Sequence, residues 1–204
     1  MNDYPAEMTL GGEDEPERSS EAEPAPDDSV PDAQDTPRAI IELEVAAPDA
    51  WALDGAALQT CIEHAAAAAL QVAQQDGVVV RRDGVPPLIE VLLTDDAAIR
   101  QLNAEWRSKD KATNVLSFPM PPEMPFIPDV PWPLGTLALA GGVMRREAQA
   151  RGVALEEHLC WMIVHGILHL LGYDHLHDEE AAHMEALERR ALARLGLADP
   201  YAEA

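Results

Sequence analysis

The chain has 204 residues, 47% of them hydrophobic, which suffices for one domain with its own core, with or without a tail. Its 37 acidic and 14 basic residues give a formal net charge of −23, so general binding to polyanions is expected to be weak unless basic residues gather in one cleft. Apolar runs stay short of the roughly 18 residues that a membrane span needs, and the acidic N-terminus lacks the pattern of a secretory signal. We expect a cytoplasmic protein that does not bind membranes.

The first part of the chain differs in composition from the rest. Residues 1–37 are rich in Pro, Glu, Asp, Ser and Ala and hold scarcely any large apolar side chain. Such a segment cannot bury enough surface to offset the entropy lost on ordering. The sequence therefore predicts a disordered acidic tail over residues 1–37, with a docking arm as the alternative, and a folded domain over residues 38–204.

Two strands and one long helix are predicted in the first half of the domain. Residues 39–45 and 88–93 have the apolar character of strands, the first with alternation in its C-terminal half. Between them, residues 53–75 are Ala-rich with apolar side chains at helical spacing, which predicts a helix. Cys61 lies in this helix and Cys160 in a later helical segment, and we interpret both as buried thiols outside any disulfide.

A second helix begins near two aspartates. Either Asp95 or Asp96 can accept hydrogen bonds from the first free backbone amides and so cap the helix. Ile99, Leu102 and Trp106 follow at helical spacing, which predicts that their side chains share one face.

A polar loop, a short strand and a proline-rich segment follow this helix. Residues 107–114 form the loop and contain the only two lysines of the chain, Lys109 and Lys111. Residues 115–118 have the pattern of a strand. Residues 119–133 hold seven prolines, so this segment is predicted to be a stiff extended loop rather than an element.

The last third of the chain is predicted to hold one strand and three helices. They span residues 134–140, 143–152, 155–171 and 178–195. The resulting order, β-α-β-α-β-β-α-α-α, predicts an α+β domain in which about five helices pack over one small, mixed, four-stranded sheet.

Three histidines, His165, His169 and His175, lie on and just after the fourth helix. Residues four apart share a helix face, with Cβ atoms about 5–6 Å apart, so His165 and His169 can grip one metal ion. Gly172 offers a helix stop, and the turn after it can bring His175 back over the same face. Three neutral nitrogen ligands with an open position are typical of catalytic zinc. His177 is the competitor for the third ligand, and a satisfied core histidine is the alternative for any one of them.

The histidine run differs from the common metalloprotease motif. In that motif a glutamate directly follows the first histidine and serves as the general base. Here the position is Gly166. A peptidase or amidase is therefore a weaker alternative for the function of the chain.

Two stretches together resemble the signatures of the bacterial YbeY family of metal-dependent endoribonucleases. One is the run from His165 to His175. The other is Leu102-Asn103-x-x-Trp106-Arg107-x-x-Asp110-x-x-Thr113-Asn114-Val115-Leu116-Ser117-Phe118-Pro119. The element order fits the family over residues 38–197, so only the tail lies outside the resemblance.

The resemblance implies a function, a cofactor and a site. It implies a single-strand-specific endoribonuclease that matures the 3′ end of 16S rRNA and acts in ribosome quality control, with an rRNA precursor and the ribosome or small-subunit factors as partners. His165, His169 and His175 would hold one Zn²⁺ ion. Arg107 would be the cleft arginine needed for activity. The alternatives are a metallohydrolase of another class and a non-catalytic ribosome-associated factor with a structural metal.

Two positions depart from the family pattern, which usually has Asp at Asn114 and an acidic residue at Thr136. Neither is a metal ligand in that pattern, so the departures concern the support of the site.

The chemistry of the remaining candidates can also be argued from residue type. A guanidinium can bind two phosphate oxygens and does not deprotonate, which suits Arg107 to the charge of a phosphodiester; a helix-end arginine is the alternative. Lys109 and Lys111 are candidates for steering phosphates, or belong to a solvated loop. Asp174 is a candidate for orienting a ligand imidazole, or is a turn residue. The general base and the oligomeric state are not predicted.

Overall fold

The computed structural model describes residues 37–121, 125 and 127–202. The predicted disordered tail lies outside the described residues except for its last residue, so its state stays a prediction. The described chain holds four strands, namely β1 (Ile40–Val45), β2 (Pro87–Thr94), β3 (Val115–Pro119) and β4 (Trp132–Ala140). It also holds one short 3-10 helix, η1 (Pro48–Ala50), and five α-helices, namely α1 (Gly55–Gln75), α2 (Asp96–Arg107), α3 (Gly141–Arg151), α4 (Leu155–Leu170) and α5 (Asp178–Arg194).

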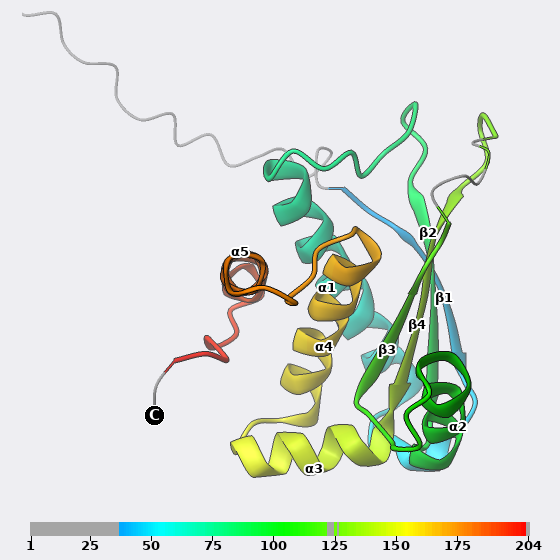
Figure 1. Ribbon diagram of the computed structural model, residues 1–204, viewed down its shortest axis with the longest axis vertical. Coiled ribbons are helices and arrows are strands. Elements are labelled where there is room, and N and C mark those ends of the chain that lie inside the picture. Colours follow the sequence, from blue (N-terminus) through cyan, green and yellow to red (C-terminus); the bar gives the residue numbers. More distant parts are fainter. Residues whose placement is uncertain (1–36, 122–124, 126, 203–204) are drawn as a thin grey trace, which may run out of the picture. The chain divides into compact units, whose positions relative to one another are not determined.

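The four strands form one mixed sheet in the order β1-β2-β4-β3. β1 and β4 each pair parallel to β2, whereas β3 pairs antiparallel to β4. The α+β prediction, with its small mixed sheet and five helices, is therefore confirmed. Figure 1 shows the sheet edge-on, with α1 and α4 on one side of it.

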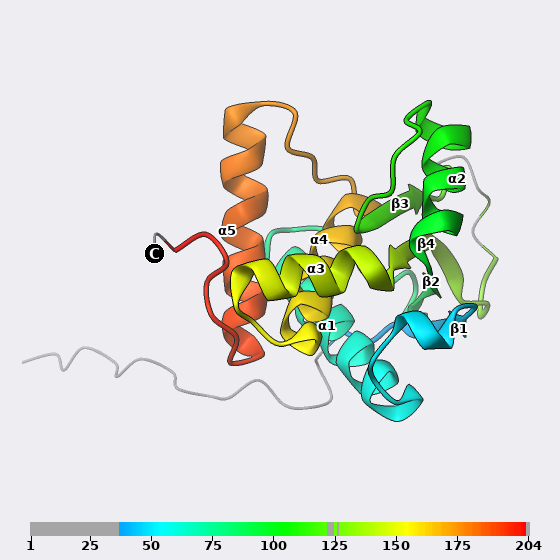
Figure 2. The same cartoon turned by 90° about the horizontal axis from the view of Figure 1, so that it is seen from below.

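The two faces of the sheet are covered differently. The larger core joins one face of β2 and β4 to α1, α4 and α5, whereas a smaller cluster places α2 on the other face. Within the larger core, α4 packs against the sheet and also against α1 and α5. Figure 2 shows α5 on the far side of α4 from the strands. Helix α4 is therefore enclosed along most of its length, which explains why it is apolar nearly all round.

The proline-rich segment is shorter than predicted at both ends. Pro119 closes β3, and Trp132 and Pro133 open β4, so the strands extend into the predicted loop. Proline is tolerated at such strand ends because few ladder hydrogen bonds are lost there. A register irregularity between Leu88 and Ile89 of β2 lies opposite this start of β4.

Helix α2 is capped by one of the two candidate aspartates, and the aromatic residue predicted on its apolar face is exposed. The side chain of Asp95 accepts a hydrogen bond from the Ala98 amide at 2.8 Å, so Asp95 is the cap. Ile99 is fully buried, but Trp106 is 65% exposed. Because β3 is the edge strand, Trp106 meets Phe118 edge-on with ring centroids 5.8 Å apart and is not enclosed.

Both cysteines are free, as predicted. Cys61 on α1 is buried and Cys160 on α4 is half-buried, with the Cys160 thiol 3.8 Å from the Cys61 carbonyl oxygen. Among the described helices, none combines the length and the apolar character that crossing a bilayer would require.

Candidate metal centre and cleft

The end of α4 places three imidazoles together. Gly172 adopts a φ of 94°, and the Gly172 and Tyr173 amides donate to the carbonyls of His169 and Leu168, both at 3.0 Å. This pair of hydrogen bonds is a Schellman motif, which ends the helix and turns the chain back over its last turn. One ligand nitrogen from each of His165, His169 and His175 then lies within 4.8 Å of the other two. The predicted helix stop and the convergence of the three side chains are therefore found.

The outer nitrogens of two of these imidazoles are held by acceptors. His165 Nδ1 lies 2.7 Å from a carboxylate oxygen of Glu188, and His169 Nδ1 lies 3.0 Å from the Tyr173 carbonyl oxygen. A carbonyl or ionised carboxylate only accepts, so in the neutral rings each Nδ1 carries the proton and each Nε2 presents a lone pair. The Nε2 atoms of His165 and His169 are 3.1 Å apart. Two lone pairs that face each other at this distance repel unless a metal ion or a proton lies between them.

The surroundings of His169 and of the Glu188 carboxylate suit a metal site. Burial, together with the neighbouring His165, lowers the pKa of His169 below its ordinary value, which keeps the ring neutral near pH 7. Burial works against ionisation of Glu188, but hydrogen bonds from His165, Tyr201 and Trp161 outweigh it, and the pKa of Glu188 lies below its usual value. The carboxylate behind His165 is therefore charged at neutral pH.

The turn after α4 shapes the third position. Asp174 Oδ1 accepts a hydrogen bond from the His175 backbone amide at 2.7 Å, which is what a turn residue does. The imidazole contacts described above come instead from Glu188 and Tyr173. His177 lies next to the first residue of α5 and is exposed, outside the group of three. The geometry therefore favours His175 over His177 as the third ligand.

This donor set fits a divalent ion that prefers nitrogen. Zinc binds imidazole at about 2.0–2.1 Å, so two imidazole nitrogens on one tetrahedral ion are about 3.3 Å apart. The 3.1 Å between His165 and His169 is close to that spacing. His175 is exposed. The three residues could therefore hold an ion in the wall of a cleft that solvent and substrate can enter.

A cleft of about 580 Å³ opens beside the three histidines. Its walls come from the end of α2, the loop before β3, β3 itself and the turn after α4. The lining residues are Arg107, Lys109, Thr113, Asn114, Val115, Ser117, Pro119, His165, His169, Gly172, Tyr173, Asp174, His175 and Leu176. The structure thus brings Arg107 and Lys109 into the same cavity as the histidines, although they are distant in the sequence. Lys111 is not among the lining residues.

Asn103 holds the cationic loop in shape, a role that the sequence did not reveal. Its side chain is 5% exposed and donates to the Lys111 carbonyl at 2.6 Å. Its own carbonyl accepts hydrogen bonds from the amides of Ser108 and Lys109. Ser108 has a φ of 56°, which ends α2 and turns the chain toward the cleft. The only signal for this role in the sequence was that Asn103 belongs to the same family motif as Arg107.

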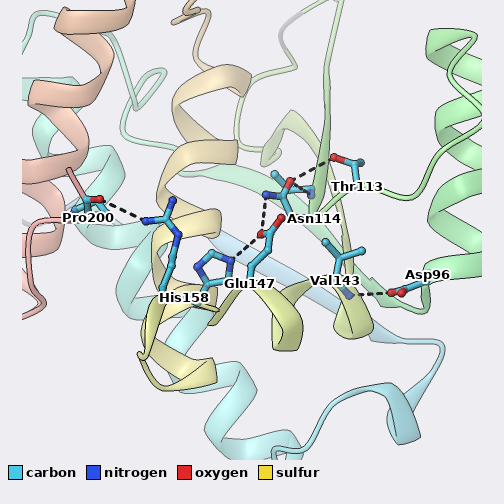
Figure 3. A network of polar contacts seen from close by, with 9 residues as sticks. Asp96, Thr113, Asn114, Val143, Glu147, His158 and Pro200 are labelled. Carbon is cyan, nitrogen blue, oxygen red and sulfur yellow. Dashed lines mark hydrogen bonds and ion pairs between the residues drawn. The ribbon is translucent and has the colours of Figure 1, made fainter. Parts of the chain in front are cut away.

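The two departures from the family pattern lie in different surroundings. Asn114 lines the cleft, and its side-chain amide donates to Glu147 at 3.0 Å. Glu147 also contacts His158 Nε2 at 2.9 Å, so the carboxylate lies between the two side chains, as Figure 3 shows. Thr136 donates instead to Glu90 at 2.6 Å on the sheet face opposite the histidines. Only Asn114 is placed to affect the cleft.

Gly166 is glycine because the sheet lies directly against α4. A Cβ atom placed on Gly166 would be 2.8 Å from Cδ2 of Leu137 and 3.4 Å from Oγ of Ser117. The position that carries the general base in the common metalloprotease motif therefore faces the core and cannot accept a glutamate. This geometry disfavours the peptidase alternative.

Fold and site together define an α+β protein with a candidate three-histidine metal centre in a cleft that also holds an arginine and a lysine. The model of the family described as Endoribonuclease YbeY matches residues 50–196. The chain belongs to the YbeY family.

Relatives named Endoribonuclease YbeY support this assignment along most of the domain. Proteins named Endoribonuclease YbeY are similar to this chain in Sinorhizobium fredii, with 52% identity over 119 residues, and in Paramagnetospirillum magneticum, with 49% identity over 129 residues. These alignments cover 58% and 62% of this chain, and 68% and 78% of the respective relatives. A Thermotoga maritima protein solved in solution is 20% identical, with a TM-score of 0.45, and the match covers 80% of this chain and all of that one.

Proposed function

We propose that this chain is a zinc-dependent endoribonuclease that cleaves single-stranded RNA in the maturation of the 16S rRNA 3′ end and in ribosome quality control. Membership of the YbeY family supports an rRNA-processing endoribonuclease. The observation that carries the proposal is the shared cleft, in which Arg107 lies with His165, His169 and His175. The rRNA precursor is the proposed substrate, and the ribosome or small-subunit factors are the proposed partners.

The three histidines are proposed to hold the ion. Zinc bound by three neutral imidazoles lowers the pKa of bound water toward about 7 and acts as a Lewis acid. Imidazole also suits copper, iron and nickel, so zinc is the choice that family resemblance favours. Glu188 and the Tyr173 carbonyl lie within hydrogen-bond distance of the outer nitrogens of His165 and His169, which leaves the Nε2 atoms for the ion.

Arg107 is proposed to bind the phosphate under attack. The transition state of phosphodiester cleavage gathers charge on the non-bridging oxygens, and a guanidinium can donate two parallel hydrogen bonds to them. Arg107 is exposed in the cleft wall and is therefore available to substrate. Lys109 lines the same wall and is proposed to attract the flanking phosphates, whereas Lys111 acts at most at longer range.

The decisive experiment uses the full chain and two substrates. Purified protein is incubated with an rRNA precursor and with casein, with and without a chelator, beside His165→Ala. His64→Ala is the matched control, because His64 is exposed on α1 and outside the cluster. We expect the natural protein to cleave RNA but not casein. RNA cleavage should be lost on chelation and in His165→Ala, and should be kept in His64→Ala.

Other outcomes would favour a different function. Cleavage of casein would favour a hydrolase of another class. Bound metal without cleavage of either polymer would favour a non-catalytic ribosome-associated factor. RNA cleavage that survives both chelation and the His165 substitution would refute the metal-dependent mechanism.

A further inference from the structure

A buried carboxylate lies directly behind the first candidate ligand. Glu188 on α5 is 1% exposed, and one of its oxygens, Oε1, lies 2.7 Å from His165 Nδ1. The other oxygen, Oε2, accepts hydrogen bonds from Trp161 Nε1 at 2.7 Å and from the Tyr201 hydroxyl at 2.5 Å. An indole N–H can only donate, so these contacts leave Oε1 for the imidazole. The carboxylate is thereby fixed in one orientation.

The buried carboxylate depends on its hydrogen-bond partners. A buried carboxylate without hydrogen-bond partners is strongly disfavoured, whereas a satisfied network orders every member of it. Trp161 lies one turn before His165 on α4, Glu188 lies on α5, and Tyr201 lies beyond the end of α5. Three separate parts of the chain therefore meet at the carboxylate that contacts the outer nitrogen of His165.

The C-terminal segment is held in place by side chains of two helices. Arg189 pairs with Asp199 at 3.3 Å, and its guanidinium lies 4.8 Å from the centre of the Tyr201 ring. Arg151 donates to the Pro200 carbonyl at 3.4 Å. The Tyr201 ring meets the Trp161 ring edge-on, with centroids 5.8 Å apart. These contacts position the Tyr201 hydroxyl over Glu188.

We propose that Glu188, completed by Trp161 and by Tyr201 from the C-terminal segment, is a positioning residue that fixes the tautomer and orientation of His165 for metal binding. With Nδ1–H donated to Glu188, the Nε2 lone pair points at the 3.1 Å gap shared with His169. The inference deepens the proposed function by making the last residues of the fold part of the metal centre. It rests on that function only in taking the three histidines as ligands.

The first test needs no metal and no activity. Long-range ¹H–¹⁵N correlation spectra of the metal-free full chain report which ring nitrogen of each histidine carries the proton. We expect His165 to be the Nδ1–H tautomer in the natural sequence, and to become a mixture of tautomers in Glu188→Ala. Glu188→Gln is the second variant should the alanine variant fail to fold, because it conserves volume but cannot satisfy all three donors.

The second test measures binding of Zn²⁺ alone by competition with a chromogenic chelator. Loss of a carboxylate partner of a metal-bound histidine typically weakens metal affinity by about 10–100-fold, and we expect this range for both Glu188 variants. Tyr201→Phe keeps the ring contacts and removes one donor, so we expect a smaller loss. Bound Co²⁺ should show an altered visible spectrum in the Glu188 variants. Glu63→Gln is the control, since Glu63 is an exposed carboxylate on α1 that contacts Gln59, away from this network.

The outcomes separate this inference from the proposed function. An unchanged His165 tautomer in the folded Glu188 variants, or zinc affinity within twofold of the natural sequence, would overturn the positioning role. A weakened metal site in a chain that never cleaves RNA would support the positioning role and overturn the proposed function instead.

Discussion

Gly166 on α4 packs directly against Leu137 on β4, with 2.8 Å between an ideal Cβ on the glycine and Cδ2 of the leucine. Leu137 is fully buried and has little freedom to move. We expect Gly166→Ala to gain about 1 kcal/mol of helix propensity but to lose about 1–3 kcal/mol through overpacking, and so to lower the free energy of unfolding. Urea unfolding of the variant and of the natural sequence measures this change in the free energy of unfolding. Combining the change with Leu137→Ala should cost less than the sum of the two single changes, and strict additivity would contradict the contact.

The identity of the third ligand predicts a difference between two neighbouring histidines. His175→Ala should lower bound zinc well below one ion per chain at limiting metal, because only His175 has a nitrogen within 4.8 Å of those of His165 and His169 among the described residues. His177→Ala should retain it, since His177 is exposed at the start of α5. Metal analysis after dialysis gives the zinc content of each variant. The reverse pattern would show that His177, and not His175, is the third ligand.

Removing the cleft guanidinium should affect chemistry and leave the metal in place. Arg107→Ala is expected to lower kcat/KM for RNA by about 10²–10³, the usual effect of deleting one group that stabilises transition-state charge. Arg107→Lys should recover only part of this loss, because an ammonium cannot donate in parallel to two oxygens. Arg145→Ala on the exposed face of α3 is the control. Unchanged cleavage by Arg107→Ala with zinc bound would remove Arg107 from the mechanism.

The buried amide of Asn103 should matter for both stability and activity. Asn103→Ala leaves the Lys111 carbonyl without its 2.6 Å donor and should cost about 1–3 kcal/mol of unfolding free energy. Because this bond also shapes the loop that carries Arg107 and Lys109, we expect kcat/KM for RNA to fall. Gln101→Ala, at an exposed position of the same helix, should change neither. An Asn103→Ala variant that is as stable and as active as the natural sequence would disprove the role of this amide.

The contacts of Asp76 are expected to make a contribution to stability that depends on pH. Its carboxylate accepts hydrogen bonds from the Tyr173 hydroxyl at 2.7 Å and from His183 at 2.9 Å, and these contacts hold its pKa below the ordinary value of 3.8. A carboxyl with a depressed folded-state pKa adds stability that is fully present above the unfolded-state pKa and is lost as pH falls through the folded-state pKa.

We therefore expect Asp76→Asn to lower the free energy of unfolding at pH 7 by about 1 kcal/mol. Below about pH 4, where the Asp76 carboxyl of the unfolded chain takes up its proton, the difference from the natural sequence should shrink as pH falls through the folded-state pKa. Urea unfolding at a series of pH values below about 5 measures this difference. A difference that grows as pH falls below about 4 would contradict the assignment.

The order and type of the elements followed from local patterns. Alternation along β1, apolar spacing along α1 and α4, and the Asp95 cap are properties of neighbouring residues, so each could be predicted without knowing the fold. The spacing of His165 and His169 belongs to the same class, because a helix alone sets their proximity. Proline content was a poorer guide, since strand pairing extended β3 and β4 into the predicted loop.

The surroundings of the histidines depended on packing between distant segments. Glu188 lies behind His165 only because α5 packs on α4, and Tyr201 reaches it only because Arg189 and Arg151 hold the C-terminal segment. No local period encodes such contacts. The sequence by itself determined the elements and the three candidate ligands, because backbone geometry links residues a few positions apart. Tertiary structure alone decided which wall faces the candidate ligands, which carboxylate lies behind His165 and why Gly166 has no side chain, because each depends on surfaces that meet only when the helices close on the sheet.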